Sequence, residues 1–159
     1  MKNYSNITPR FCFVDTKYLN YLRNFDYKVS LKDNRKFLVL AIKINKFIYA
    51  IPLSSVIKHR TNSVTVKIYN DKKIISYLLL NNMIPVHEYM LTDFIIDPSK
   101  DTYEALEEHY IRKNYQSICI KAMKVYSKRN NPNNIEYEFM CQICVNFKKL
   151  EEALLKYNS

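Results

Sequence analysis

The sequence predicts an α+β fold, in which a small β-barrel or curled antiparallel sheet comes first and helices follow. Two observations predict it. Residues 10 to about 90 contain many short β-rich runs separated by turn residues, a pattern typical of small barrels. From Asp101 onward, apolar residues recur at helical spacing instead. A chain of 159 residues suits one domain, with the β-rich part over about 10–90 and a helical addition over about 101–157.

The first predicted elements are a strand and a short helix. "RFCFVD", residues 10–15, alternates apolar and other residues as a strand does. Asp15 or Thr16 can cap the segment that follows, in which Tyr18, Leu22 and Phe25 recur at helical spacing.

Two hairpins follow in the sequence. "KFLVLAIKI" and "KFIYAIPL" are β-rich runs separated by the turn-like Asn45 and Lys46. "SVTVKIY" and "IISYLLL" flank the turn "NDKK", and "MIPV" is a brief apolar segment with Pro85 at an edge or a bend.

The last third of the chain predicts two helices. Asp101 and Glu104 form a capping box that opens one long helix. That helix carries an apolar stripe, formed by Ile111, Tyr115, Ile118, Ala122 and Val125, and "RNNPNN" ends it. A final helix in "NFKKLEEALLKY" begins at the cap Asn146 and places Leu150, Leu154 and Tyr157 on one side.

Composition narrows the possible functions. Twenty-five Lys and Arg against fifteen Asp and Glu give a formal charge of +10, which favours polyanions such as nucleic acid as partners. An AT-rich genome that inflates Lys, Asn, Ile and Tyr is the alternative explanation of this charge. Glycine is absent, which excludes a P-loop and a dinucleotide fingerprint because both need glycine close to phosphate.

The cysteines and histidines do not predict a metal site or a cofactor. Cys141 and Cys144 form one Cys-x-x-Cys pair, but a structural zinc site needs a second close pair. We therefore expect reduced, mostly buried thiols, with no metal and no cofactor. No apolar run approaches the length that spans a bilayer, and no signal-peptide segment begins the chain, so a cytoplasmic protein is expected.

One end of the first hairpin gathers groups suited to metal-free RNA cleavage. A ribose 2′-OH can attack the adjacent phosphorus if nearby groups take its proton, stabilise the phosphorane and assist the leaving 5′-oxygen. Arg35 and Lys36 begin one strand and Ser54 and Ser55 end its partner, so they lie at the same end of the hairpin. Each has an ordinary alternative: the serines can cap a turn, and the charges can be solvated. Tyr18, on the first helix, can equally be a core residue.

Five blocks of the sequence, taken in order, resemble a known family. They are "TKYLNYLRNFDYKV", "RKFLVLAIKINKFIYAIPLSS", "NNMIPV", "HYIRKN" and "NFKKLEEALLKY". Their order and spacing, from about Phe11 to Tyr157, are similar to those of the ToxN/AbiQ family of type III toxin-antitoxin endoribonucleases, particularly its shorter CptN-type members.

The resemblance implies a fold, an activity and a partner. The implied fold is a small SH3-like barrel of the Kid and MazF type, elaborated with helices, as a single toxin domain over 1–159. The implied activity is sequence-selective, metal-independent cleavage of cellular or phage mRNA that leaves a 2′,3′-cyclic phosphate and a 5′-hydroxyl, with a role in abortive infection or growth arrest. The implied partner is a repeat-derived antitoxin RNA, which the toxin processes and whose pseudoknots inhibit it in a closed hetero-oligomer.

The resemblance also implies roles for individual residues. Ser55 would act at the scissile phosphate beside Ser54, Arg35 would stabilise that phosphate with Lys36 as a substitute, and Tyr18 would orient the nucleophile. Tyr110 would stack on a base. RNA backbone contacts would come from the remaining basic candidates, which are Lys17, Lys58, His59, Arg60, Arg112 and Lys113. The segment "VIKHR" departs from the family pattern, which leaves His59 either a shifted family histidine or a bystander.

Two other function classes stay open from the residues alone. A non-catalytic RNA-binding module would use the same basic face only to hold structured RNA. A DNA-binding regulator would need a helix-turn-helix signature or a basic recognition helix, and neither is found in the sequence.

Overall fold

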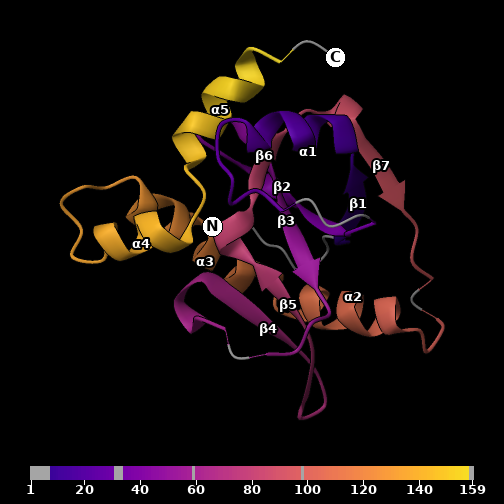
Figure 1. Ribbon diagram of the computed structural model, residues 1–159. Helices are drawn as coiled ribbons and strands as arrows, with labels where there is room; N and C mark the ends of the chain where they lie inside the picture. Colours follow the sequence, from indigo (N-terminus) through magenta and orange to yellow (C-terminus); the bar gives the residue numbers. More distant parts are fainter. Residues whose placement is uncertain (1–7, 31–33, 59, 98, 158–159) are drawn as a thin grey trace.

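A computed structural model describes residues 8–30, 34–58, 60–97 and 99–157. Within these residues the chain forms an antiparallel sheet of seven strands and five α-helices (Figure 1). The strands are β1 (Arg10–Val14), β2 (Phe37–Ile44), β3 (Phe47–Ser54), β4 (Thr65–Asn70), β5 (Lys73–Leu79), β6 (Ile84–Val86) and β7 (Leu91–Phe94). The helices are α1 (Thr16–Arg23), α2 (Tyr103–Lys113), α3 (Tyr115–Arg129), α4 (Tyr137–Ile143) and α5 (Phe147–Leu155). An α+β fold is thereby confirmed.

The sheet is open, which differs from the expected closed barrel. Its strand order is β4-β5-β3-β2-β1-β7, and β6 pairs with β3 beside β5. Among the described residues, β4 and β7 therefore stand at opposite edges of the path. β3 pairs with β2 along one edge, while its other edge pairs with β6 near its start and with β5 at its end.

The β2–β3 hairpin forms as predicted, and its turn needs an unusual backbone. Asn45 and Lys46 have φ angles of 50° and 71°. Two consecutive left-handed residues make the turn type whose twist matches a two-residue hairpin loop. Asn tolerates this region well, whereas Lys46 occupies it at a steric cost because of its Cβ. Glycine would avoid this cost, but the chain has none.

The strand and helix at the start of the chain are also confirmed. The Asp15 side chain accepts a hydrogen bond from the Lys17 N–H and so caps α1. Tyr18 and Leu22 are buried on the inner face of α1, and Phe25 packs half-buried beyond its end.

The long helix predicted from Asp101 is instead two helices. α2 ends and α3 begins at Asn114, whose backbone (φ −111°, ψ 17°) leaves the helical region. The Asn114 amide donates to the Tyr110 carbonyl, which occupies a helix end. The N-cap is Thr102, which accepts from the Ala105 N–H, rather than Asp101. The apolar stripe was predicted correctly, because all five of its residues are buried.

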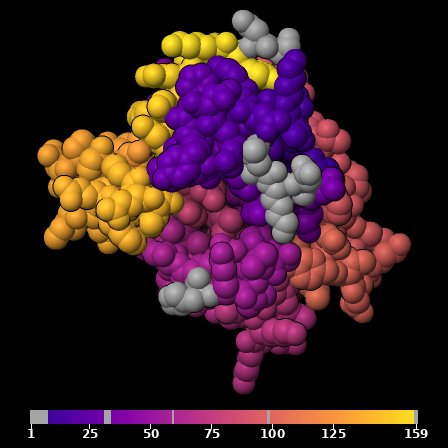
Figure 2. Space-filling model, in the orientation of Figure 1, coloured from indigo at the N-terminus to yellow at the C-terminus, as the bar shows by residue number. Residues whose placement is uncertain are grey.

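The last helix is held to the sheet by a buried carboxylate. Asn146 caps α5 through the Lys149 N–H, as predicted. Glu151 is 3% exposed and accepts hydrogen bonds from Tyr49, Tyr126 and Asn45. Tyr21 of α1 donates to the Ala153 carbonyl, and Figure 2 shows the N-terminal segment packed against α5. A search of the described helices for one long and apolar enough to cross a bilayer finds no candidate.

Candidate functional site

The candidate site lies where β3 ends and β2 begins. Phe37 pairs with Pro52, and the Leu53 N–H donates to the Lys36 carbonyl at 2.9 Å. The same antiparallel register, continued by one residue, places Arg35 opposite Ser54. This is the arrangement that the hairpin predicted.

The two serines differ sharply in their surroundings. Ser54 is 2% exposed, and its Oγ accepts hydrogen bonds from Arg60 Nη2 at 2.9 Å and from the Val56 N–H at 3.3 Å. Ser55, the next residue, is exposed. Ser54 therefore caps the turn and fixes Arg60, whereas the Ser55 hydroxyl is accessible to a ligand.

Arg60 is held over an aromatic ring from the neighbouring strand. Its guanidinium carbon lies 5.2 Å from the ring centroid of Tyr77, and its Nη2 also donates to the Val56 carbonyl. The Tyr77 hydroxyl donates to the Lys58 carbonyl at 3.0 Å, and the Tyr77 backbone pairs with Ser54. Tyr77 thus holds the loop that follows Ser54 from beneath.

Arg35 adds a second guanidinium to this site. Burial lowers the pKa of Arg35, and the nearby positive charge of Arg60 lowers it further. Its Nε and Nη1 atoms are buried and have no hydrogen-bond partner among the described residues, as is also true of Arg60 Nε. Two neighbouring guanidinium groups with unused donors are suited to an anion.

Lys36 is engaged elsewhere. Its Nζ lies 2.6 Å from an oxygen of Glu107, which is 1% exposed, and 3.9 Å from Glu104. The same ammonium faces the rings of Phe94 and Tyr103. Successive residues of a strand point to opposite faces, so Lys36 contacts α2 while Arg35 faces Arg60.

Tyr18 lies in the core and away from the serines. It is fully buried, its hydroxyl donates to the Pro85 carbonyl at 2.6 Å, and its ring packs on Tyr157. Pro85 pairs with Tyr49, which is about 16 Å before Ser54 along β3 at the usual rise per residue. Lys17 is exposed on the same helix, which lies at the other end of β3 from Ser54 (Figure 1).

The predicted RNA contacts on α2 divide between two sides. The Tyr110 ring packs against Tyr69 at 5.9 Å, and both line a cavity of about 350 Å³ with Lys67 and Lys121. Lys113 lines the adjoining cavity.

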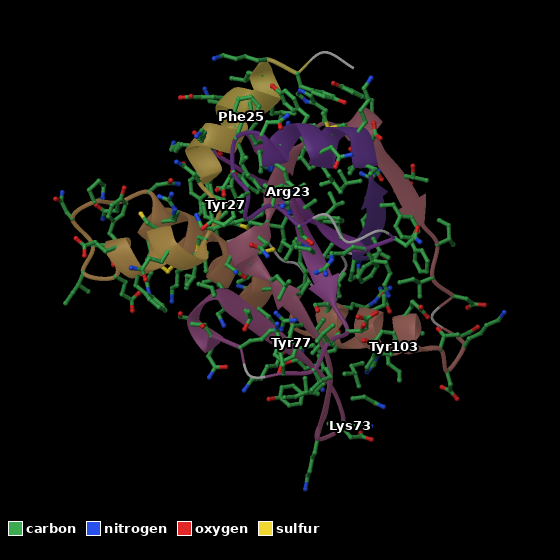
Figure 3. All side chains as sticks on the ribbon, in the orientation of Figure 1. Arg23, Phe25, Tyr27, Lys73, Tyr77 and Tyr103 are labelled. Carbon is green, nitrogen blue, oxygen red and sulfur yellow. The ribbon has the colours of Figure 1, made fainter. Side chains whose placement is uncertain are left out.

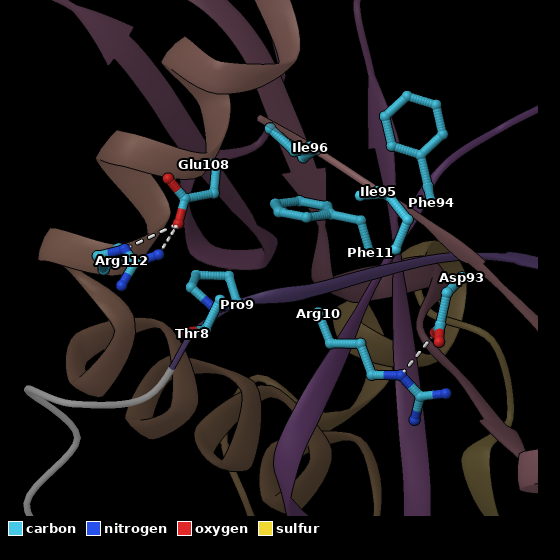
Figure 4. A pocket seen from close by; sticks show the side chains of 10 residues that line it. All are labelled: Thr8, Pro9, Arg10, Phe11, Asp93, Phe94, Ile95, Ile96, Glu108 and Arg112. Atoms are coloured by element: carbon cyan, nitrogen blue, oxygen red, sulfur yellow. Dashed lines mark hydrogen bonds and ion pairs between the residues drawn. The ribbon is translucent and has the colours of Figure 1, made fainter. Parts of the chain in front are cut away.

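Arg112 points to the other side of α2. It pairs with Glu108 and lines a separate pocket of about 320 Å³ formed by α2, β1 and the end of β7 (Figure 4). It therefore does not face Tyr69 or Tyr110.

The remaining predictions concern the loop after Ser55 and metal binding. Lys58 is exposed, and His59 lies outside the described residues. Cys12, Cys119 and Cys144 are buried free thiols, and Cys141 is half-buried. Across the described part of the chain, no three His, Cys, Asp or Glu side chains gather in a way that could hold a metal ion.

Comparison with known proteins identifies relatives over nearly the whole chain. The sequence model described as toxin ToxN, type III toxin-antitoxin system, matches residues 10–155. The chain is 34% identical to Endoribonuclease ToxN of Bacillus thuringiensis subsp. kurstaki, over 94% of this chain and 84% of that protein. It is 30% identical to Endoribonuclease AbiQ of Lactococcus lactis subsp. lactis, over 99% and 93% of the two chains.

A solved structure agrees with these matches. It comes from work on selective inhibition of a bacterial type III toxin by a non-coding RNA pseudoknot. It superposes with a TM-score of 0.86 at 31% identity and covers 95% of this chain and 98% of that one. The chain belongs to the ToxN toxin family of type III toxin-antitoxin systems.

Proposed function

We propose that the chain is the endoribonuclease toxin of a type III toxin-antitoxin system. It cleaves RNA by attack of a ribose 2′-OH on the adjacent phosphorus, which gives a 2′,3′-cyclic phosphate and a 5′-hydroxyl. Two relatives that span most of its length are endoribonucleases, which supports this reaction class.

The observation that carries the proposal is the pair of guanidinium groups beside the serines. Arg35 and Arg60 lie close enough that one lowers the pKa of the other, and both keep buried N–H donors without a partner among the described residues. Negative charge increases on the phosphorane oxygens as the 2′-oxygen attacks, so preformed donors stabilise the transition state more than the bound substrate.

Each residue of the site then has a distinct role. Arg35 and Arg60 bind the scissile phosphate, and the accessible Ser55 hydroxyl contacts it directly. Ser54 positions Arg60 through the hydrogen bond to Nη2. Lys36, Tyr18 and Lys17 stand outside the reacting groups, because their contacts or positions direct them elsewhere.

The RNA extends from this site toward α2. Tyr110 offers a ring for an unstacked base, and Lys58 and Lys113 are exposed cations for the backbone. Arg112 belongs to a more distant part of this footprint. For His59 we retain the RNA contact proposed from the sequence.

The natural partner is a repeat-derived antitoxin RNA whose pseudoknot blocks the site in a closed toxin–RNA assembly. One relative is inhibited by an RNA pseudoknot, which supports this partner class. Because antitoxin and mRNA substrates are both cytoplasmic in bacteria, we place the activity there. We further propose that the open sheet is a relative of the Kid and MazF barrel, which a strand-by-strand superposition would test.

The test combines product analysis with one charge substitution. The purified protein, with a chelator present, should cut single-stranded RNA into fragments whose 5′ ends accept phosphate from a polynucleotide kinase. Arg35→Gln should slow this cleavage by about 100-fold or more. Lys156→Gln removes one charge at the exposed end of α5 and should cleave normally.

Two outcomes would contradict the proposal. Normal cleavage by Arg35→Gln would reject the site. Salt-sensitive RNA binding without any cleavage product would instead identify a non-catalytic RNA-binding module.

A further inference from the structure

A second basic site lies apart from Ser54, where the loop after α1 meets α3 and α5. It is a cavity of about 410 Å³ between the loop after α1, the end of α3 and the start of α5. We call it the basic pocket, and its main polar residues are Arg23, Asp26, Lys28, Arg129, Asn146 and Lys149. In Figure 3, Arg23, the last residue of α1, lies above Tyr77 of the cleavage site, which is a residue of β5.

The one carboxylate of the basic pocket is already occupied. Asp26 is 8% exposed, and its Oδ2 accepts from the Asn146 N–H at 2.7 Å. Its Oδ1 accepts from the Lys28 N–H at 3.0 Å and lies 3.8 Å from Lys28 Nζ. Asp26 thus fixes the start of α5 to the loop, and no ion pair joins it to Arg129 among the described residues.

Arg129 is the buried cation of this pocket. It is 8% exposed at the end of α3, and its Nε is buried with no hydrogen-bond partner among the described residues. A buried guanidinium with an unused donor is costly unless an anion or an acceptor approaches it. Since Asp26 is bonded to backbone groups, no described protein group accepts from Arg129 Nε, and a bound anion can supply the acceptor.

The surrounding charges favour an anion. Arg23, Lys28, Arg129 and Lys149 line the cavity against Asp26 alone, which gives a local formal charge of +3. α5 also begins here, and the N-terminus of a helix attracts negative charge.

An exposed aromatic residue beside these cations identifies the kind of anion. Tyr27 lines the same cavity and is 74% exposed, and Lys28 Nζ lies 5.3 Å from its ring centroid. A phosphate site with an accessible aromatic face beside it matches a nucleotide of single-stranded RNA, whose phosphate meets the cations while its base stacks on the ring.

We propose that the basic pocket binds a backbone phosphate of RNA with Arg129 and Lys149, while Tyr27 stacks on the adjacent unpaired base. This inference rests on the proposed function, because it extends the RNA footprint of the same protein. The pocket shares no lining residue with the cleavage site. It therefore affects affinity for long RNA and not the chemical step.

The experiment measures the affinity of the whole chain for RNA that cannot be cleaved. The probe is a single-stranded 2′-O-methyl RNA of about 30 nucleotides, titrated at several salt concentrations. Lys149→Gln and Arg129→Gln should each weaken binding several-fold and lower the slope of log affinity against log salt by about 0.7. Tyr27→Ala should weaken binding about 10-fold with the slope unchanged.

The neighbouring lysine provides a matched control. Lys148→Gln removes the same charge from the same turn of α5, but Lys148 Nζ faces the Tyr126 ring and does not line the pocket. It should bind RNA like the unaltered chain. Thermal unfolding of each variant verifies that the fold is retained, and Lys149 and Tyr27 are exposed positions where substitution is tolerated.

Three outcomes separate the possibilities. Equal affinities for Lys149→Gln, Tyr27→Ala and Lys148→Gln would overturn the inference. It would also be overturned if inorganic phosphate stabilised the chain through Arg129 while RNA affinity stayed unchanged, because the ligand would then be a small anion. If the unaltered chain cleaves no RNA, the proposed function fails, and the binding comparison still decides whether the basic pocket holds RNA.

Discussion

Ser54 and Ser55 are neighbours in the chain but occupy different environments, and this difference is experimentally separable. Ser54→Ala should lower the free energy of unfolding by about 1 kcal/mol, since it removes the buried hydroxyl that accepts hydrogen bonds from Arg60 and the Val56 N–H. Ser55→Ala should change that free energy by less than about 0.5 kcal/mol, because Ser55 is exposed. Urea unfolding measures both values.

Cleavage assays complete this comparison. We expect Ser55→Ala to abolish RNA cleavage despite its unchanged stability, and Ser54→Ala to reduce cleavage through the displaced Arg60. A Ser55→Ala protein that cleaves RNA at the normal rate would remove Ser55 from the site.

Tyr77 provides the second prediction at this scale. Tyr77→Phe keeps the ring beneath Arg60 but removes the hydrogen bond to the Lys58 carbonyl. We expect the free energy of unfolding to fall by about 0.5–1.5 kcal/mol and cleavage to slow, because the loop carrying Arg60 is held less firmly. Tyr103→Phe, which removes a hydroxyl bonded to the Ile75 carbonyl outside this loop, is the control and should cleave RNA normally. Equal cleavage by both variants would show that Tyr77 does not position the loop.

Sequence reasoning found the residues of this site that depend on local pairing and missed those that do not. Arg35 facing Ser54 follows from the hairpin register alone. Lys36 was expected beside it, but the alternation of a strand turns adjacent side chains to opposite faces. Tyr77 reaches Arg60 through the pairing of β3 with β5, which no short-range pattern predicts.

At the scale of elements, strong periodicity predicted the helices but not their interruptions. The apolar stripe runs through Asn114 without a change of spacing, so the sequence indicated one helix where α2 and α3 meet. The break depends on the Asn114 side chain bonding to the Tyr110 carbonyl. β7 and α4 were not predicted, since they are short, with four and seven residues, and a periodic pattern needs a longer segment to be recognised.

The β2–β3 turn supplies a prediction for this scale. Lys46 has a φ of 71°, a region that costs a residue with a Cβ about 1 kcal/mol and costs glycine almost nothing. Lys46→Gly should therefore raise the free energy of unfolding by about 0.5–1 kcal/mol. Lys46→Ala, which removes the charge but keeps the Cβ, should not raise it. Denaturant unfolding of both variants measures the difference, and equal stabilities would show that the turn is not strained.

At the scale of the whole molecule, the closure of the sheet could not be read from the sequence. A succession of short strands fits a barrel and an open sheet equally well, because the difference lies in which edges pair. β7 pairs with β1, the first strand, and so ends the sheet opposite β4. Pairings between strands so distant in the chain depend on the packing of the helices, which leaves only the α+β class predictable.

Three buried free thiols lie far apart in the chain, with Cys12 in β1, Cys119 in α3 and Cys144 directly after α4. Burial raises the pKa of Cys12 to about 12, of Cys119 to about 11 and of Cys144 to about 12, against an ordinary value of 9.0. Burial also raises the pKa values of Tyr18 and Tyr49, whose ordinary value is 10.0. In the unfolded chain, the thiols therefore lose their protons at a lower pH than the tyrosine hydroxyls do.

We predict from these shifts that the protein loses stability above pH 9. The folded thiols keep their protons there, whereas the same thiols in the unfolded chain release theirs, so unfolding becomes more favourable as pH rises from about 9 toward 11 or 12. Each thiol lowers the free energy of unfolding by at most about 1.4 kcal/mol per pH unit in this range. Urea unfolding at intervals between pH 7.5 and about pH 10 measures the slope.

A variant with Cys12, Cys119 and Cys144 replaced by alanine should be less stable at pH 7.5 because of the cavities, yet its stability should fall less between pH 9 and 10. Parallel curves for the two proteins would show instead that other groups, and not the buried thiols, govern the alkaline response.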